Sequence, residues 1–156
     1  MGPVELDGRR AGKSHRGPGG ARAMPDERIT LGNPSTIFPP TGYSHVAEVR
    51  GGRLVFIAGQ VAIDPKGTLV GPGDYRAQAE EVFRNLERAL ASAGATFRDV
   101  VKLTYYVLDL THLPEIREVR DRFVDTKHPP TSTAVQVARL FRPEILLEID
   151  AVASVA

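Results

Sequence analysis

Apolar positions between residues 74 and 95 recur at spacings of three and one, which is the pattern of a helix with one buried face. Asp74 precedes this stripe in the position of an N-cap residue, and Gly94 follows it in the position of a C-terminal glycine. The pattern therefore predicts an α-helix between these two residues. Its buried face is expected to carry Ala79, Val82, Phe83, Leu86, Ala89 and Leu90.

Period-two alternation and β-branched residues predict strands elsewhere in the chain. Residues 45–63 have the pattern of a hairpin, because two alternating stretches flank a turn at Gly51 and Gly52. Three further strands are expected within residues 99–110, 128–140 and 145–155, which are rich in β-branched or alternating apolar residues.

A second, shorter helix is expected after residue 110, with Thr111 as its N-cap and Pro114 tolerated in its first turn. The resulting order is hairpin, helix, strand, helix, strand, strand. This order predicts an α+β fold with a single sheet and both helices on one face. The inward face of the second helix should carry Leu113, Ile116, Val119 and Phe123.

The opposite face of the predicted sheet has no cover within the chain. Residues 54–63 and 146–155 are apolar on both sides of their alternation, so a monomer would expose a large apolar patch. Self-association as a dimer or a cyclic trimer would bury this face. Ligand pockets often lie at such seams between subunits.

The composition indicates one domain and limits the classes of function. The chain has 156 residues and no cysteine, which excludes disulfides, thiolate nucleophiles and cysteine metal sites. Residues 1–23 carry five basic and two acidic side chains, so the remaining residues hold fifteen basic and seventeen acidic ones, a net charge of −2. An acidic body of this kind disfavours nucleic-acid binding.

The N-terminal stretch differs in composition from the rest of the chain. Six of the fifteen glycines lie in residues 1–23, and this stretch has no aromatic residue and no sustained apolar period. We therefore expect a disordered extension over residues 1–27 and one folded domain over residues 28–156. No stretch has the length of a membrane span or the apolar core of a secretory signal, so cytoplasmic localisation is expected.

Six segments, taken in their order along the chain, match those of a known protein family: GYSH (42–45), FIAGQV (56–61), ALASAGA (89–95), DVVKLTYYVLDL (99–110), VQVARL (135–140) and LEIDAVA (147–153). With these segments the chain resembles the Rid family, the reactive intermediate deaminases also called YjgF. The resemblance covers essentially residues 28–156, and it implies a chorismate-mutase-like (YjgF-type) α+β homotrimer with three clefts between subunits.

The best-studied members of the Rid family hydrolyse enamine and imine intermediates, giving a 2-keto acid and ammonia without a metal or cofactor. The resemblance implies that an Arg ahead of the VxVARL strand binds the substrate carboxylate. Ser132 occupies the aligned position here, so that charge-assisted contact is lost. At two other cleft positions the chain keeps the family's residues, the Tyr as Tyr43 and the strand Glu as Glu148. At two more it departs from them. Ala58 replaces the Ser of the family's SGQ motif, whose Gln is kept as Gln60, and Arg117 replaces the Asn of the second helix.

Glu148 is the strongest catalytic candidate, because apolar neighbours on its strand should raise the pKa of its carboxyl toward that of a useful acid or base. Asp150 lies on the same strand face and is expected to be structural. His45 should lie on the same side of an extended segment as Tyr43 and shape the pocket with it. Ser132 and Thr133 are expected to contact a substrate group that carries no charge. No histidine pair has metal-binding spacing, so no metal and no cofactor are expected.

Three functional hypotheses remain open on the sequence. The first is a cofactor-free hydrolase of imines or enamines, in which Glu148 activates water in a cleft between subunits. The second is a non-catalytic ligand-binding or interaction protein that keeps the trimer and its clefts. The third is an endoribonuclease, which the acidic body disfavours.

Overall fold

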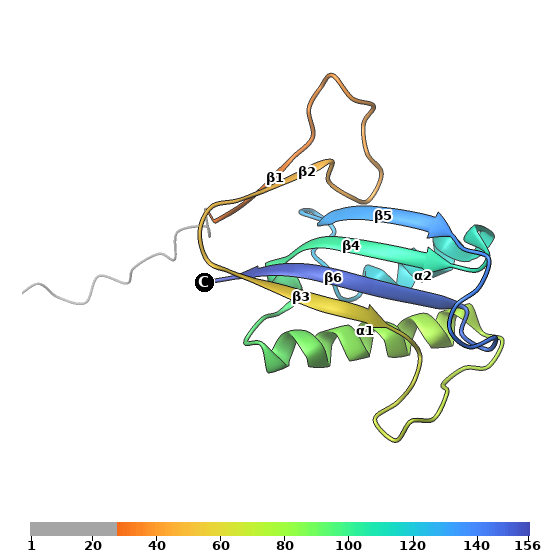
Figure 1. Ribbon diagram of the computed structural model, residues 1–156. Coiled ribbons are helices and arrows are strands. Elements are labelled where there is room, and N and C mark those ends of the chain that lie inside the picture. Colours follow the sequence, from red (N-terminus) through yellow and green to blue (C-terminus); the bar gives the residue numbers. More distant parts are fainter. Residues whose placement is uncertain (1–27) are drawn as a thin grey trace, which may run out of the picture.

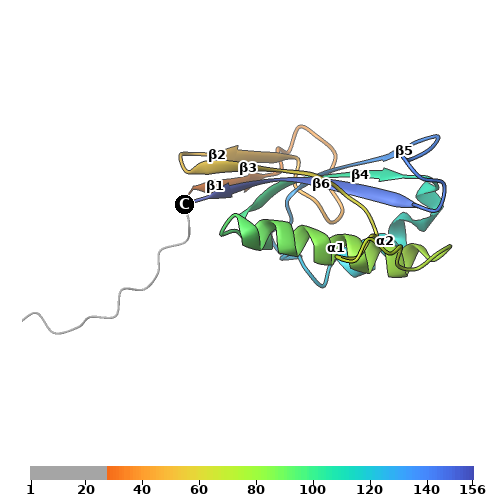
Figure 2. The same ribbon diagram turned by 60° about the horizontal axis from the view of Figure 1, so that its bottom comes forward.

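The computed structural model describes residues 28–156, so the expected N-terminal extension over residues 1–27 lies outside the described residues. The described chain forms two layers, a sheet and a pair of helices that cover one face of it (Figures 1 and 2). All neighbouring strands of the four-stranded sheet are antiparallel except β4 and β5. In spatial order the strands are β3 (Arg53–Gln60), β6 (Leu147–Val155), β4 (Val100–Val107) and β5 (Thr131–Gln136).

The predicted hairpin over residues 45–63 is wrong. Gly51 and Gly52 do turn the chain, with φ of 77° and 82°, but the strands on either side of them take different partners. β2 (Val46–Val49) pairs with β1 (Ile29–Gly32) in a separate two-stranded sheet, and β3 pairs with β6. The eight-residue β3 gains a longer apolar partner in the nine-residue β6 than the four-residue β2 would offer.

The first helix, α1 (Tyr75–Ser92), confirms the predicted ends. The Asp74 carboxylate accepts a hydrogen bond from the Ala77 N–H at 3.0 Å, and Gly94 takes a φ of 72° just after the helix. Gln78 is an unexpected polar member of the buried face. Its amide donates to the carbonyls of Gly71 and Glu144 and accepts from the Leu146 N–H, so it attaches the loop before α1 and the loop before β6 to the helix.

The second helix, α2 (Leu113–Arg120), begins later than predicted. Thr111 is not its N-cap but lies within a short 3₁₀ helix, η2 (Leu110–His112). Asp109 caps that turn instead, because its carboxylate accepts from both the N–H and the hydroxyl of Thr111. Pro114 does lie in the first turn of α2, and Ile116 and Val119 are fully buried as predicted.

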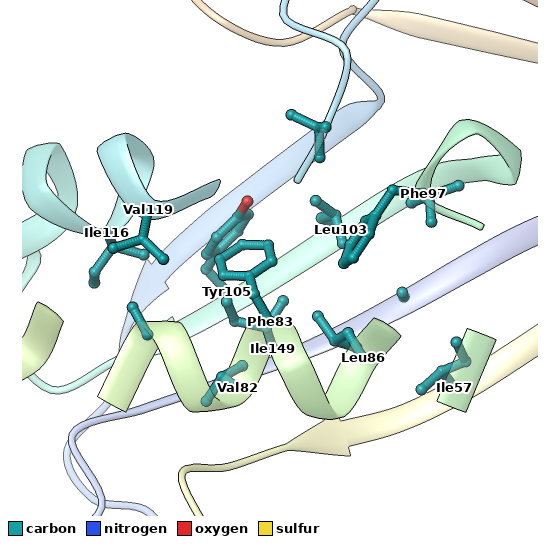
Figure 3. Packing of buried hydrophobic residues seen from close by; sticks show 14 of the residues in the cluster. Ile57, Val82, Phe83, Leu86, Phe97, Leu103, Tyr105, Ile116, Val119 and Ile149 are labelled. Atoms are coloured by element: carbon teal, nitrogen blue, oxygen red, sulfur yellow. The ribbon is translucent and has the colours of Figure 1, made fainter. Parts of the chain in front are cut away.

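The core lies between the helices and the sheet, and Phe83 of α1 is at its centre (Figure 3). The Phe83 ring stacks on Phe123 at a centroid distance of 5.3 Å and also contacts Phe97, which belongs to the 3₁₀ helix η1 (Phe97–Asp99). Tyr105 and Ile149 face the same space from β4 and β6. Burying side chains of this size contributes about 1.5–3 kcal/mol each.

The face of the sheet away from α1 and α2, here called the open face, carries large exposed apolar side chains. Leu54 is 53% exposed, Phe56 is 74% exposed and Val135 is 38% exposed. The prediction of an uncovered apolar face is therefore confirmed for the single chain. Among residues 28–156, no helix is long and apolar enough to cross a membrane.

Replacing Asp74 by alanine should lower the free energy of unfolding by about 1 kcal/mol, because it removes the N-cap hydrogen bond of α1. Urea denaturation followed by circular dichroism measures the change. Glu87→Ala is the matched control, since Glu87 is exposed in the same helix. An equal effect of both substitutions would show that the charge, and not the cap, matters.

Candidate functional site

Strand pairing determines which side chains share the open face. In β4 and β6, Thr104 lies beside Asp150 and Tyr106 lies beside Glu148. These side chains alternate with the buried ones, so all four point away from the helices. The open face therefore combines a polar region on β4 and β6 with the exposed apolar side chains described above.

Glu148 lies directly against the backbone of β3. A Cβ atom added at Gly59 would stand only 2.6 Å from Cδ of Glu148, so a side chain at position 59 and the observed carboxylate exclude one another. Gly59 lies where the register of β3 against β6 shifts between Ile57 and Gln60. Glycine at such a bulge permits a close approach of another group to the strand.

The surroundings of Glu148 favour its protonated form. Burial raises the pKa of the Glu148 carboxyl, and the charge of Asp150 raises it further, which confirms the predicted direction. Within residues 28–156, the Glu148 carboxylate has no hydrogen-bond partner. It is therefore available to a water molecule or a ligand.

Asp150 is held by Tyr106, whose hydroxyl donates to Oδ2 of Asp150 at 3.1 Å. This hydrogen bond, together with the charge of Asp150, raises the pKa of the Tyr106 hydroxyl, which consequently stays protonated. Tyr106 thus fixes the carboxylate beside Glu148, in keeping with a structural role for Asp150.

A hollow of about 440 Å³ opens beside this polar region. Ala58 lines it, and the Gln60 amide donates to the Ala58 carbonyl at 3.2 Å. Glu148, Ala58 and Gln60 thus come together as one set, here called the Glu148 group. The hollow is lined by Phe56, Ile57, Ala58, Gly59, Asp150, Ala151 and Val152.

Tyr43 and His45 lie in a different place, in the loop that joins β1 to β2. Their rings meet edge to face at 5.3 Å, which confirms that they lie on the same side of the segment. The His45 Nε2 atom is hydrogen-bonded to the Phe38 carbonyl at 2.7 Å. The buried Ser44 between them donates its hydroxyl to the Pro129 carbonyl and its N–H to the Pro130 carbonyl, so the loop is attached at the start of β5.

The hydroxyls at the start of β5 point to alternate faces. Thr131 donates to the Val101 carbonyl at 2.6 Å, and Thr133 accepts from the Lys102 ammonium at 2.6 Å on the open face. Ser132 pairs with the buried Leu103 and therefore points to the helix side. Ser132 and Thr133 consequently do not converge on one ligand group within the chain.

Arg117 also lies on the helix side. Burial raises the pKa of the Tyr105 hydroxyl, and the positive charges of Arg120 and Arg117 oppose that rise, so both guanidinium groups lie near this hydroxyl. Arg120 is occupied, because it donates to the Gly42 carbonyl at 2.8 Å and pairs with Asp121. Arg117 forms no ion pair with any other residue between 28 and 156.

The predicted site residues therefore do not all meet within one chain. The second set, here called the β5 group, comprises Tyr43, His45, Ser132 and Arg117. Strand β4 and the helix-side packing separate it from the Glu148 group. In the described part of the chain, no set of three His, Cys, Asp or Glu side chains is arranged to hold a metal ion.

Sequence reasoning did not identify Gly59, Tyr106 or Arg120 as parts of the site. A glycine inside an apolar strand is a signal of close approach, and it would have drawn attention to Gly59. The contacts of Tyr106 and Arg120 depend on strand register and helix packing, which no local motif reveals.

Substituting Gly59 by alanine should displace the Glu148 carboxylate toward solvent and return its pKa toward the ordinary value, because desolvation is the main cause of the shift. Carboxyl-detected NMR titration measures this pKa. Gly32→Ala is the control, since a Cβ there meets only Val46 at an ordinary 3.9 Å. An unchanged Glu148 pKa in Gly59→Ala would contradict this description of the site.

Replacing Glu148 by glutamine should change how stability depends on pH. Because the pKa of Glu148 is raised in the folded state, that state binds the proton more tightly than the unfolded chain does. The wild type should therefore lose stability relative to Glu148→Gln as the pH rises from the unfolded pKa through the folded pKa. Urea unfolding across this range tests the sign, with Glu87→Gln as control, and a relative gain by the wild type would refute it.

Comparison with known proteins identifies the family. Residues 35–155 match the family described as Endoribonuclease L-PSP. Protein DfrA of Myxococcus xanthus is 39% identical over 111 residues, which cover 71% of this chain and 83% of DfrA. TdcF of Escherichia coli, whose name describes a reactive intermediate deaminase, is 35% identical over 104 residues, covering 65% of this chain and 79% of TdcF.

Solved structures agree with the sequence comparison. YyfB of Yersinia pestis, described as a member of the Rid protein family, gives a TM-score of 0.75 at 38% identity, covering 82% of this chain and 99% of YyfB. E. coli TdcF with bound serine gives a TM-score of 0.61 at 34% identity, covering 69% of this chain and 85% of TdcF. The α+β arrangement and the matching sequence together show that this chain belongs to the Rid (YjgF) family.

Proposed function

We propose that the protein hydrolyses a small imine or enamine, with Glu148 as the group that activates water. The observation that carries this proposal is the state of Glu148, a carboxyl with a raised pKa and no hydrogen-bond partner within residues 28–156. A carboxyl of this kind can take a proton from water and return it later in the reaction. The relative TdcF bears the name of a reactive intermediate deaminase and binds serine, which supports a small amino-acid-like ligand.

The proposed reaction needs only water. The Glu148 carboxylate takes a proton as the water oxygen bonds to the imine carbon, and it returns this proton to the nitrogen as the carbon–nitrogen double bond becomes single. In the second step the carboxylate moves the hydroxyl proton to the amino group, and breaking the carbon–nitrogen bond then releases ammonia and leaves a carbonyl product. An enamine enters the same sequence once its carbon gains a proton and its nitrogen loses one, which converts it into the imine.

A second copy of the chain is part of this proposal. One chain keeps the Glu148 group and the β5 group apart, and it exposes Leu54, Phe56 and Val135 on the open face. Packing these faces together in a homotrimer would bury the apolar side chains and bring the edge strand β5 of one subunit, with Thr133 on its open face and the Tyr43 loop at its start, to the Glu148 group of the next. The clefts between subunits would then be the catalytic sites.

The β5 group bears on the choice of substrate. Ser132 stands where the family resemblance implies a carboxylate-binding Arg, and a hydroxyl there forms a neutral hydrogen bond in place of a charge-assisted one. We therefore propose a substrate without a free carboxylate at this position, such as an imine derived from an amino-acid amide. Thr133, whose hydroxyl lies on the open face, would donate a hydrogen bond to its neutral carbonyl.

A binding protein without catalysis is the second candidate. The departures at Ser132, Ala58 and Arg117 favour it, because all three fall at positions where the resemblance implies cleft residues. The endoribonuclease activity in the description of the family remains less favoured, since residues 24–156 carry fifteen basic against seventeen acidic side chains.

Imine hydrolysis tests the proposal directly. Imines are generated in situ from amino acids and from amino-acid amides in the presence of the full chain, and the release of ammonia is measured. We expect turnover of the amide-derived imines and a loss of at least about 100-fold in Glu148→Gln, the size typical of removing an acid or base. Glu87→Gln should retain full activity.

Ser132→Arg separates the two candidates. If the wild type is inert on every imine while Ser132→Arg hydrolyses imines that carry a carboxylate, the natural protein is a binding protein on a competent scaffold. Turnover that is unchanged in Glu148→Gln would rule out the role proposed for this residue.

A further inference from the structure

A second cavity, of about 580 Å³, is lined by none of the predicted site residues. It is lined by residues of β1, η1, the start of β4 and the segment over residues 125–130, and it is open to solvent on one side. Its volume is within the range of small-molecule sites. The lining residues are Ile29, Leu31, Phe97, Arg98, Val100, Asp125, His128 and Pro130.

Most of the cavity wall is apolar and well anchored. Phe97 and Val100 belong to the main core, and Ile29 and Leu31 are held in register by the pairing of β1 with β2. Pro130 is fixed through its carbonyl, which accepts a hydrogen bond from the Ser44 N–H. The cavity is therefore part of the folded structure and does not depend on a single loop.

Arg98 contributes a positive charge at the rim. A capping box fixes η1, because the Thr96 N–H donates to Asp99 at 2.8 Å and the Arg98 N–H donates to the Thr96 hydroxyl at 3.2 Å. The Asp99 carboxylate is thereby engaged, and it also pairs with Arg28 at 3.5 Å. The Arg98 guanidinium has no hydrogen bond or ion pair with any other residue from 28 to 156.

Asp125 contributes a negative charge at the same cavity. Its Oδ2 atom is hydrogen-bonded to His128 Nδ1 at 3.0 Å, and its Oδ1 accepts from the Lys127 N–H at 2.9 Å. The hydrogen bond with His128 is the main cause that lowers the pKa of Asp125, so the carboxylate is ionised at neutral pH. Each oxygen retains a lone pair for a further donor.

We propose that this cavity binds a small zwitterion with a large apolar side chain, such as an aromatic amino acid. The carboxylate of the ligand pairs with Arg98, its ammonium group pairs with Asp125, and its side chain lies against Phe97 and Val100. An anion without an ammonium group would gain no contact with Asp125, and a cation without a carboxylate would gain none with Arg98. The site is independent of the proposed hydrolase function, since it shares no residue with the Glu148 group.

NMR titration of the full chain with three related probes tests the proposal. The probes are L-phenylalanine, L-phenylalaninamide, which lacks the carboxylate, and 3-phenylpropionate, which lacks the ammonium group. Phenylalanine should shift the amide signals of Ile29, Phe97 and Val100 saturably and bind about three to ten times more tightly than either truncated probe. Equal binding of all three, binding of the anion alone, or no saturable shift at these residues would overturn the proposal.

Two substitutions test whether Arg98 binds the carboxylate of the ligand and Asp125 its ammonium group. Arg98→Gln should abolish the preference for phenylalanine over phenylalaninamide, and Asp125→Asn should abolish the preference over 3-phenylpropionate. Arg84→Gln, an exposed arginine of α1, should change neither, and Glu148→Gln should leave binding intact even if imine hydrolysis is lost. A preference that survives both Arg98→Gln and Asp125→Asn would refute the assignment.

Discussion

The packing of α1 on β6 determines the position of every functional side chain in the sheet. Phe83 and Leu86 of the helix are fully buried against a strand whose inward residues, from Leu147 to Ala153, alternate without a break. Because the residues on either side of Glu148 point toward the helices, the Glu148 side chain lies on the open face. A register shift of one residue would bury two carboxylates and expose the core, so the core fixes the site.

The open face combines a partly desolvated carboxyl with exposed apolar side chains, and a single chain leaves both open to water. Glu148 is partly desolvated by its closeness to Gly59, which suits acid–base chemistry, whereas Phe56 on the neighbouring strand is exposed. Covering the apolar part of this face by other copies of the chain would deepen the desolvation of the carboxyl. Assembly and catalysis therefore depend on the same surface in our account.

The sequence predicts the burial of individual residues more accurately than it predicts which residues contact one another. Periodicity identified α1, β4 and β6 and placed Glu148 in an environment that raises its pKa, because a side chain's face follows from its position in the repeat. It did not predict that β2 pairs with β1, since alternation carries no information about the partner strand. The choice of Asp109 over Thr111 as a cap, and the contact of Gly59 with Glu148, likewise depend on three-dimensional geometry.

The mass of the protein in solution tests the central claim that further copies cover the open face. Sedimentation velocity should give about three times the chain mass of 16.9 kDa for the wild type and a single chain for Phe56→Arg, which places a charge in the proposed interface. Arg84→Gln, on the exposed surface of α1, should sediment like the wild type. A wild-type protein that sediments as a single chain at all concentrations would contradict the claim that neighbouring copies complete the site.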